Sequence, residues 1–339
     1  MKAAFYEGHE NISTGVCTPL PPGPGQVQIR VSHCGICGTD LHIFHGKMDQ
    51  RVKLPQIIGH EMSGTIESVG EGVSDWRRSD RVTVRPLDPC GNCPACKAGH
   101  SHICMNLKFI GIDSPGAMQE LWTVPAHTLH RLPASLSFDQ AALIEPLSVA
   151  CHDVRMGEVR AGEYVVVLGG GPIGLLIGLV AKAAGASVLI SEVNPYRIQL
   201  AKGLGLDAVD PRSVDLPDVV AGNTDGAGAD VVFEVAGVNA ATEMMTKLPR
   251  TRGRIVMVAI HSQPTPVDLF RFFWRELRLI GARVYEPQDF EKAIQLADSG
   301  ALPLDKIVTK VVPLEGLGSA FREMESGGEV MKILVRCSA

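Results

Sequence analysis

The pattern of apolar and polar positions differs between the middle of the chain and its start. In residues 160–285, short apolar runs such as YVVVL and SVLIS alternate with longer Ala- and Leu-rich stretches such as PIGLLIGLVAKAAG. Short apolar runs of this kind indicate buried strands, and the longer stretches between them indicate helices. The alternation predicts an α/β fold with a doubly wound parallel sheet.

The first 145 residues follow another pattern. Short β-branched runs, such as VQIRVSH and DRVTVRP, stand between segments rich in Gly, Pro and Cys, and they predict a β-rich unit with many turns. From residue 290 the chain has a helix-like FEKAIQLADSG, a strand-like IVTKVVPL, a helix-like LEGLGSAFREMESG and a strand-like MKILVRC. The pattern leaves open whether this last part extends the parallel sheet or returns to the first unit.

Length and charge narrow the kinds of partner. A chain of 339 residues is long enough for about two domains. Its formal net charge is −5 and its basic residues do not cluster, so we expect neither nucleic acid nor a membrane as partner. The N-terminal MKAAFYEGHEN lacks the apolar stretch of a signal peptide, and glycines and a proline interrupt the apolar VVVLGGGPIGLLIGLV. We therefore expect a cytoplasmic protein whose nine cysteines are free thiols or metal ligands.

One loop, DPCGNCPACKAGHSHIC, brings four cysteines close together in the sequence. They follow the spacing C-x2-C-x2-C-x7-C and are Cys90, Cys93, Cys96 and Cys104. Four thiolates in a Gly- and Pro-rich loop are typical of a closed, tetrahedral Zn²⁺ site that stiffens a lobe. An iron–sulfur cluster is the competing hypothesis, because C-x2-C-x2-C also occurs in such sites. Four unrelated buried thiols would be a surprising coincidence at this spacing.

A second segment, HCGICGTDLHIFH at residues 33–45, also contains residues that bind metals. Cys34 and Cys37 form a C-x-x-C pair, and His42 and His45 an H-x-x-H pair. The spacing permits a complete zinc site, a redox pair, or one ligand of a site completed far away in the sequence. These three possibilities imply a structural metal, no metal, and a catalytic metal, respectively.

A dinucleotide fingerprint follows the apolar run YVVVL. Residues 169–174, GGGPIG, match G-x-G-x-x-G and open a helix-like stretch, which is the context that the motif requires. The glycines allow a tight turn, close approach of the backbone to a pyrophosphate, and close packing of helix on strand. The residues expected to bind the cofactor here are Gly169, Gly171, Pro172, Ile173 and Gly174. A glycine turn without a nucleotide is the less favoured alternative.

An acidic residue indicates which dinucleotide binds. The next strand ends at Glu192, about 20 residues after the glycines, where a carboxylate can accept hydrogen bonds from a ribose 2′-hydroxyl and repel a 2′-phosphate. This favours NAD over NADP. Arg197 could flank the adenine or pair with Glu192. Val258 and Ile260 end a later strand and are expected to contact the cofactor through their backbone, although a role in the sheet core explains them equally well.

Five motifs occur in an order that resembles a known family. They are GICGTDLH, GHE followed by G-x-I-x-x-V-G, the four-cysteine loop, EPLSV and GGGPIG. This set is similar to the zinc-containing medium-chain dehydrogenases, specifically the polyol, butanediol and threonine dehydrogenase branch, over essentially the whole chain. The resemblance implies a β-rich, GroES-like catalytic domain formed by residues 1–148 and 289–339. It also implies an inserted NAD-binding Rossmann domain at residues 149–288.

The resemblance also implies roles for particular residues. Cys37, His60 and Glu61 would bind a catalytic zinc, and Glu145 would either bind that zinc directly or hold its water. An unpaired buried carboxylate is costly, so the apolar surroundings of Glu145 in AALIEPL argue against a mere surface charge. Two further residues, Thr39 and His42, would carry the hydroxyl proton toward water. Cys34 would then be a small core residue.

The function implied is oxidation of a secondary hydroxyl to a ketone with hydride transfer to NAD. The expected substrate is a polyol, a sugar derivative or another small polar alcohol, and the expected cofactors are NAD and two zinc ions, one catalytic and one structural. L-Threonine 3-dehydrogenase and 2,3-butanediol dehydrogenase activities are alternatives. A zinc-free reductase would lack both cysteine motifs, and a non-catalytic zinc- and nucleotide-binding protein would not need Thr39 and His42. We expect a homotetramer, with a homodimer as the alternative.

Overall fold

The computed structural model describes residues 1–261 and 263–338. Contacts between Cα atoms divide the chain into two compact units. The split unit comprises Met1–Glu145 and Glu286–Ala339, and the inserted unit comprises Pro146–Tyr285. Among the described helices, none is both long enough and apolar enough to cross a membrane.

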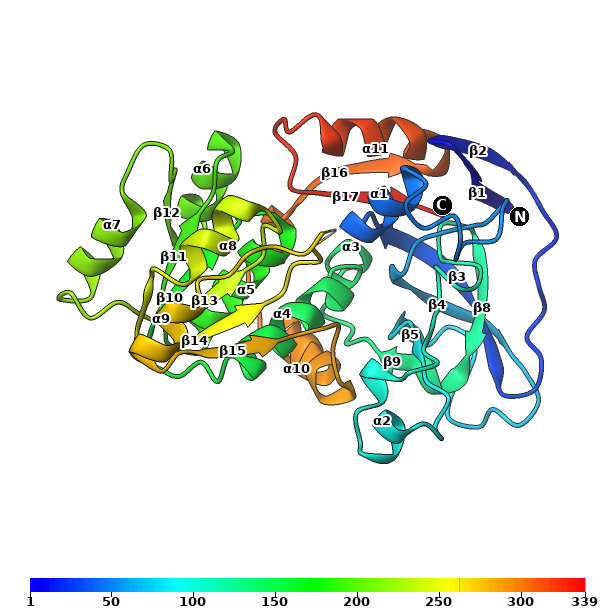
Figure 1. Ribbon diagram of the computed structural model, residues 1–339. Coiled ribbons are helices and arrows are strands. Elements are labelled where there is room, and N and C mark those ends of the chain that lie inside the picture. Colours follow the sequence, from blue (N-terminus) through cyan, green and yellow to red (C-terminus); the bar gives the residue numbers. More distant parts are fainter. Residues whose placement is uncertain (262, 339) are drawn as a thin grey trace. The chain divides into compact units, whose positions relative to one another are not determined.

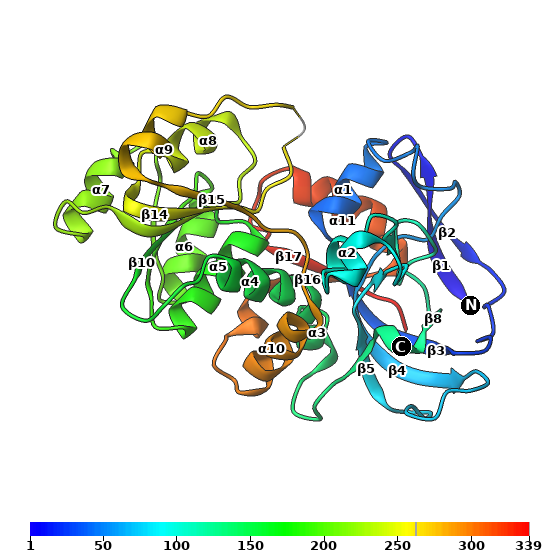
Figure 2. The same cartoon turned by 60° about the horizontal axis from the view of Figure 1, so that its bottom comes forward.

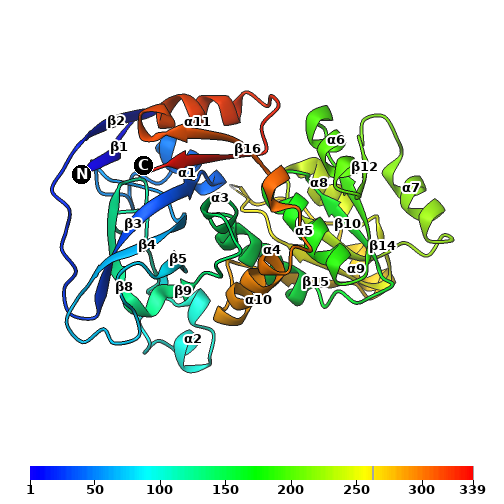
Figure 3. The ribbon, with the colours of Figure 1, turned by 180° about the vertical axis from the view of Figure 1, so that it is seen from behind.

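The split unit contains a mixed sheet with the strand order β16-β17-β3-β4-β5-β9, and β8 pairs with β3 beside this path. Its strands are β3 (Gln26–Gly35), β4 (Glu61–Val69), β5 (Arg81–Val84), β8 (Leu121–Pro125), β9 (Leu129–Arg131), β16 (Val308–Pro313) and β17 (Lys332–Arg336). The last strand, β17, lies antiparallel to β3, with Val335 opposite Cys34. Figure 3 shows β17 beside β3. The C-terminal part of the chain therefore returns to the first unit and does not extend the parallel sheet.

Short elements complete the split unit. Two further strand pairs are β1 (Lys2–Gly8) with β2 (Asn11–Val16), and β6 (Leu87–Asp88) with β7 (Lys108–Phe109). Its helices and 3₁₀ turns are α1 (Gly38–Phe44), α2 (Pro94–Lys97), η1 (Ser101–Ile103), η2 (Ala126–Thr128), α3 (Phe138–Ala141), α10 (Pro287–Asp298), η3 (Leu304–Lys306), η4 (Leu314–Gly316) and α11 (Leu317–Glu325). Helix α4 (Ile144–Met156) begins in this unit and continues in the inserted one.

The inserted unit is built on a six-stranded parallel sheet with the order β12-β11-β10-β13-β14-β15. Its strands are β10 (Tyr164–Leu168), β11 (Ser187–Ser191), β12 (Asp207–Val209), β13 (Ala229–Glu234), β14 (Pro249–Met257) and β15 (Arg278–Gly281). The helices are α5 (Pro172–Ala183), α6 (Pro195–Gly203), α7 (Leu216–Asn223), α8 (Asn239–Met245) and α9 (Leu269–Arg275), and they cover both faces of the sheet (Figures 1 and 2). This confirms the predicted α/β fold with a doubly wound sheet.

The sequence explains why this sheet is buried on both faces. Its central strands are almost wholly apolar, and Val166, Val232 and Ile255 lie in one buried core cluster. Apolar runs without alternation are typical of parallel strands that helices cover on both sides. The strand order reverses beside β10, because β11 and β12 continue to one side of it and β13, β14 and β15 to the other. In such sheets, ligands bind at the carboxyl ends of the strands at this reversal.

Candidate metal centres and dinucleotide site

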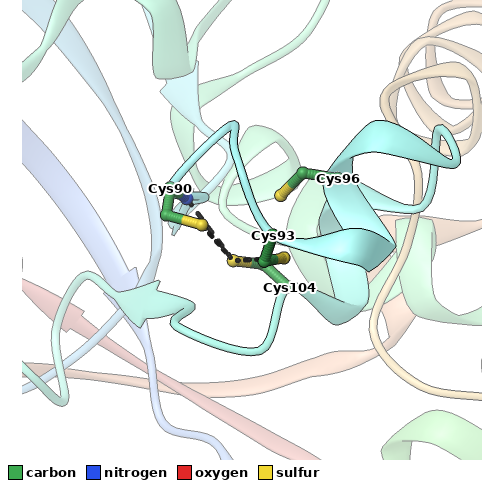
Figure 4. A group of neighbouring side chains, drawn as sticks. All are labelled: Cys90, Cys93, Cys96 and Cys104. Atoms are coloured by element: carbon green, nitrogen blue, oxygen red, sulfur yellow. Dashed lines mark hydrogen bonds between the residues drawn. The ribbon is translucent and has the colours of Figure 1, made fainter.

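The four-cysteine loop folds its sulfur atoms around a common centre (Figure 4). The Sγ atoms of Cys104 and Cys90 are 3.4 Å apart, and those of Cys104 and Cys93 are 3.8 Å apart. All four Sγ atoms lie within 4.8 Å of one another. A tetrahedral zinc site with Zn–S bonds of about 2.3 Å requires S–S separations of about 3.8 Å. The donor set and its size therefore fit one Zn²⁺ ion.

The charges of the thiols point to the same conclusion. Backbone N–H groups of Cys96 and Met105 lower the pKa of Cys93 to about 6, whereas burial and the neighbouring thiols raise the pKa of Cys96 to about 12. Backbone N–H groups also donate to the Cys104 sulfur, from Cys90 at 3.4 Å and from Asn106 at 3.3 Å. Backbone N–H groups thus favour a thiolate at Cys93, whereas the neighbouring sulfurs disfavour one at Cys96. Four thiolates this close repel one another unless a cation is bound between them.

The second cluster draws its residues from separate segments of the split unit. Cys37 caps the N-terminus of α1, His60 precedes β4, and Glu61 is the first residue of β4. Antiparallel pairing of β3 and β4 sets Gly35 opposite Glu61. A Cβ atom at position 35 would lie 2.2 Å from Glu61 Oε2, so the glycine leaves room for this carboxylate. The ligand atoms of Cys37, His60 and Glu61 lie within 4.8 Å of one another.

This geometry distinguishes among the readings of the segment at residues 33–45. Cys37 lies with His60 and Glu61, whereas Cys34 is fully buried and burial raises the pKa of its thiol well above its ordinary value. His45 pairs instead with two carboxylates: its Nδ1 is 2.7 Å from Glu10 Oε1, and its Nε2 contacts Glu325. Among the described residues, this segment thus supplies one ligand, Cys37, to a group that His60 and Glu61 complete.

Asp40 lies beside two residues of the second cluster. Its Oδ2 accepts a hydrogen bond of 2.9 Å from the Cys37 N–H. Its Oδ1 is 3.7 Å from His60 Nδ1, and both side chains are buried. A carboxylate behind a ligating histidine fixes the orientation of the ring and increases its basicity. Only the placement of β4 beside α1 reveals this role.

Lys332 is a site residue that sequence reasoning missed. It begins β17, and its Nζ forms a buried ion pair with Glu61 Oε2. Burial lowers its pKa, but Glu61 and then Cys37 raise it, and the net shift is upward. The available signal was a lone lysine at the start of the apolar strand MKILV. A fully buried lysine is rare unless it is paired.

The second cluster also has the electrostatics of a cation site. Burial by itself would lower the pKa of His60, but the Asp40 carboxylate and the Cys37 thiol hold it well above its ordinary value. Burial also raises the pKa of Asp40. The excess of negative groups thus draws protons into the cluster. A divalent cation would supply that positive charge and displace the protons, so these residues fit Zn²⁺.

Glu145 lies near this cluster but apart from its three ligand atoms. It is buried in the first turn of α4, and its charge acts on both His60 and Lys332. In the described part of the chain, the group of ligand atoms within 4.8 Å consists of Cys37, His60 and Glu61.

The two residues expected to carry a proton lie on α1. Thr39 and His42 are three positions apart in the helix, so their side chains share one face. Both are partly exposed. Burial lowers the pKa of His42, as do the charges of Lys47 and His45. His42 is therefore neutral near pH 7, which leaves its imidazole free to accept a proton.

In the inserted unit, the glycine motif forms the turn between β10 and α5. Gly169 has a φ of +108°, which favours glycine, and a Cβ at Gly174 would lie 1.9 Å from the Gly169 carbonyl oxygen. Pro172 is the first residue of α5, and Ile173 follows it. The N-terminus of α5 therefore has the close packing and the turn that a pyrophosphate site requires.

Glu192 lies at the carboxyl end of β11, beside the glycine turn. Its Oε2 accepts a hydrogen bond of 2.8 Å from Gly170 N, and its Oε1 accepts from Val193 N at 2.7 Å and Asn194 N at 2.8 Å. Arg197 Nη1 is 3.9 Å from the same carboxylate. The arginine thus pairs with Glu192, one of the two possibilities. The carboxylate also braces the turn, which the sequence did not indicate.

The last two expected cofactor residues follow β14. Val258 N donates a hydrogen bond of 3.0 Å to the Glu234 carbonyl oxygen at the end of β13. Ile260 is 77% exposed, although its side chain is apolar. Both therefore lie at the carboxyl edge of the sheet, beyond its core.

The chain is similar to known proteins over most of its length. Residues 23–134 match the alcohol dehydrogenase GroES-like domain, and residues 172–299 match the zinc-binding dehydrogenase domain. A 2-dehydro-3-deoxy-L-galactonate 5-dehydrogenase from Pseudoalteromonas atlantica is 53% identical over 100% of this chain and 99% of its own length. A sorbitol dehydrogenase from Halalkalibacterium halodurans is 34% identical over 93% of this chain and 92% of its own.

Solved structures share the fold. A protein from Sinorhizobium meliloti 1021, bound to NADP, has a TM-score of 0.93 and 33% identity, and the match covers 99% of this chain and 98% of that one. The predicted GroES-like domain with an inserted Rossmann domain and the prediction of a dehydrogenase are therefore confirmed. The chain belongs to the zinc-binding medium-chain dehydrogenase family.

Proposed function

We propose that this dehydrogenase oxidises a secondary hydroxyl of a sugar acid or polyol to a ketone, using NAD and a catalytic zinc. The observation that carries the proposal is the cluster of half-buried Cys37 with buried His60 and Glu61, in a chain that also has a dinucleotide turn. A mixed sulfur, nitrogen and oxygen donor set of three residues leaves a coordination position for substrate, as catalytic zinc sites do.

Each group around the cluster has a defined task. Cys37, His60 and Glu61 would hold the zinc, and Asp40 would orient the His60 ring. Zinc bound there supplies Lewis acidity, which makes a substrate hydroxyl easier to deprotonate. Lys332 offsets part of the negative charge beside Glu61. We assign Glu145 to water or substrate near the zinc, because its ligand atoms stand outside the three-residue group.

The proton leaves through α1. The Thr39 hydroxyl can both accept and donate a hydrogen bond, so it can take the substrate proton while passing its own outward. His42 lies on the same helix face and is neutral near pH 7, so it can receive this proton and release it to water. Along α1, Thr39 follows the Cys37 cap and His42 comes after Thr39, so the proposed transfer runs from the metal ligand toward the last turn of the helix.

For the structural ion, we propose that Cys90, Cys93, Cys96 and Cys104 hold a second zinc. Four thiolates fill a tetrahedral shell, so this ion has no open position for chemistry. Its task is to stiffen the loop that contains α2 and η1. The chain would therefore contain about two zinc ions.

NAD is the proposed cofactor, because the Glu192 carboxylate lies where a 2′-phosphate would have to fit. One neighbour with 33% identity binds NADP, so the comparisons leave both dinucleotides open. In this chain, Arg197 pairs with Glu192, and its charge is partly neutralised there. The Glu192 carboxylate would therefore repel a 2′-phosphate, and Arg197 would offset this repulsion only in part.

The name of the relative with 53% identity favours a 2-dehydro-3-deoxy sugar acid as substrate. Threonine and 2,3-butanediol remain as alternatives from the same branch. The direct test is NAD reduction with a panel of sugar acids, polyols, threonine and butanediol, each with and without a chelator. We expect chelator-sensitive oxidation of a sugar acid or polyol. Activity that persists after the zinc is removed would contradict the proposal.

We also propose that the chain assembles with copies of itself, as a homotetramer built from dimers. Helix α9 exposes Leu269, Phe270, Phe273 and Trp274, and β15 is the last strand of the parallel sheet. An edge strand beside an exposed apolar helix suits an isologous contact with a second copy. Light scattering would give the mass directly, and a monomer at micromolar concentration would contradict this assembly.

A further inference from the structure

A buried carboxylate in the inserted unit has no part in the function proposed so far. Glu234 ends β13, the strand next to β10 at the reversal of strand order, and its side chain is fully buried. A buried carboxylate is costly unless hydrogen bonds compensate it. Its Oε1 accepts a hydrogen bond of 2.8 Å from Gly237 N, and its Oε2 lies 2.9 Å from His261 Nε2.

Glu234 thereby connects the two loops that follow β13 and β14. Its carbonyl oxygen accepts hydrogen bonds from Val258 N at 3.0 Å and Ala259 N at 3.1 Å. Its side chain also forms hydrogen bonds with Gly237 in the first loop and with His261 in the second. These loops leave the carboxyl edge of the sheet, beside β13 and β14 in Figure 1.

This edge is where the second half of a dinucleotide must lie. The glycine turn and Glu192 occupy the ends of β10 and β11, and they would bind the pyrophosphate and the adenosine ribose. A dinucleotide extends across the reversal of strand order. Its nicotinamide riboside half therefore reaches the ends of β13 and β14, where Val238 and Ile260 expose apolar side chains.

A pocket of about 450 Å³ opens in the inserted unit at the end of β14. It is lined by Thr242, Met257, His261, Gln263, Pro264, Thr265 and Val267. The ring of His261 is mostly buried, with 18% of its side chain exposed. Four of these seven side chains are polar, so the pocket offers hydrogen-bonding groups beside His261.

The carboxylate determines which nitrogen of His261 is free to act. An ionised carboxylate only accepts hydrogen bonds, so Nε2 must carry the proton that it donates to Glu234. In the tautomer that has its proton on Nε2, Nδ1 is a hydrogen-bond acceptor. Among the described residues, the hydrogen bond of His261 to another residue is the one through Nε2.

We propose that Glu234 and His261 form a cofactor-positioning pair, in which His261 Nδ1 accepts a hydrogen bond from the nicotinamide riboside half. Glu234 fixes the tautomer and holds both loops. The donor is either the carboxamide NH₂ or a ribose hydroxyl, which share the same chemistry. This inference rests on the proposed function, because it assumes that the unit binds NAD.

The test uses two substitutions that separate the ring nitrogens. In His261→Gln, the side-chain amide can still donate to Glu234 from the position of Nε2, but it offers nothing at the position of Nδ1. In Glu234→Gln, the amide oxygen keeps the hydrogen bond from Gly237 N, so the amide NH₂ faces His261 Nε2. This donor favours the other tautomer of His261, which has its proton on Nδ1. The matched control is His127→Gln in the split unit, where Nε2 is 3.3 Å from Asp88 Oδ1 on the exposed surface.

Each protein is titrated with NADH and with ADP, which lacks the whole nicotinamide riboside half. We expect His261→Gln and Glu234→Gln to bind NADH about five- to tenfold more weakly, as the loss of one hydrogen bond implies, and to bind ADP as the wild type does. The histidine ¹⁵N shifts of Glu234→Gln should show the changed tautomer. His127→Gln should match the wild type with both ligands.

Other outcomes would overturn the inference. NADH binding unchanged in His261→Gln would mean that the histidine only anchors a loop. Equal weakening of NADH and ADP binding would mean that the variants disturb the whole unit. If the wild type bound neither ligand, the proposed function itself would fail together with the inference. A 3-acetylpyridine analogue of NAD identifies the donor, because it lacks the carboxamide NH₂ and should be insensitive to His261→Gln if that group is the partner.

Discussion

The two cysteine-containing clusters of the split unit differ in how the chain builds them. The four sulfurs of Cys90, Cys93, Cys96 and Cys104 come from one loop, so a local fold brings them together. The cluster of Cys37, His60 and Glu61 needs α1, the start of β4 and the pairing of β3 with β4. A local loop can form a closed site with one kind of donor. A site drawn from several elements can combine sulfur, nitrogen and oxygen and keep a position open.

Their surroundings differ as well. Backbone N–H groups surround the loop sulfurs, and they stabilise thiolates wherever the loop folds. Charged side chains surround the second cluster, with Asp40 behind His60 and Lys332 beside Glu61. The difference implies that the loop contributes to stability and the buried cluster to chemistry, and substitutions in each can separate the two tasks.

The largest expected effect comes from Cys37→Ser. We expect this variant to lose dehydrogenase activity and one zinc per chain while its fold persists, because the loop site is untouched. Activity and metal analysis on the same sample measure both. Cys34→Ala is the matched control, since Cys34 is buried outside the ligand group, and it should keep its zinc and most activity. Equal loss of zinc and activity in both variants would contradict the assignment of Cys37, and not Cys34, as a zinc ligand.

Removal of a loop ligand should act on stability first. Cys104→Ser leaves three thiolates, so we expect the loss of the second zinc and a thermal midpoint lower by roughly 5–10 °C. Below that midpoint, the buried cluster should still support activity. Calorimetry with parallel assays measures this, and an inactive variant with an unchanged midpoint would mean that the loop site takes part in the chemistry.

Lys332→Met tests the charged surroundings of the buried cluster. It removes the positive charge while nearly keeping the length of the side chain, so Glu61 loses its ion pair. We expect zinc affinity to fall by about 10- to 100-fold, as it does for other residues that contact zinc ligands. Competition with a chelating dye measures that affinity. Lys310→Met breaks an exposed pair of 2.6 Å with Glu323 and should change neither affinity nor stability by more than about 1 kcal/mol.

The smallest effect concerns the inserted unit, where no metal is expected. Glu192→Ala should reduce the preference for NAD over NADP, because the repulsion of a 2′-phosphate is lost. The carboxylate also accepts three backbone hydrogen bonds, so we expect some loss of affinity for both dinucleotides. The ratio of kcat/KM for NAD to that for NADP separates these effects. An unchanged ratio would mean that Glu192 does not determine the preference between the two cofactors.

The contrast between the clusters also explains what the sequence could predict. The loop site and the glycine turn depend on contiguous residues, so spacing and context identify them. Cys37, His60 and Glu61 came together only through the resemblance to a family, because no local rule brings β4 beside α1. The sequence marks Lys332 as a lone lysine in an apolar strand, but not its partner Glu61. That partner depends on the pairing of β17 with β3, and the apolar pattern left the place of β17 open.

The same limit applies to Asp40 and to Glu234. Each lies in a stretch whose local pattern explains it adequately, as a helix cap or as the end of a strand. Their partners, His60 and His261, are distant in sequence and are brought near by sheet register. Local pattern therefore predicted the elements and the ligand types, and the tertiary structure supplied the charges that act on them.

Zinc counting during partial chelation tests the central claim most directly. The wild type should contain about two zinc ions per chain. Brief exposure to a chelator should remove one of them together with all activity, while the thermal midpoint changes little because the closed thiolate site keeps its ion. Restoration of one zinc should restore activity. A single zinc in the untreated protein, or full activity after one of two ions has been removed, would contradict the account.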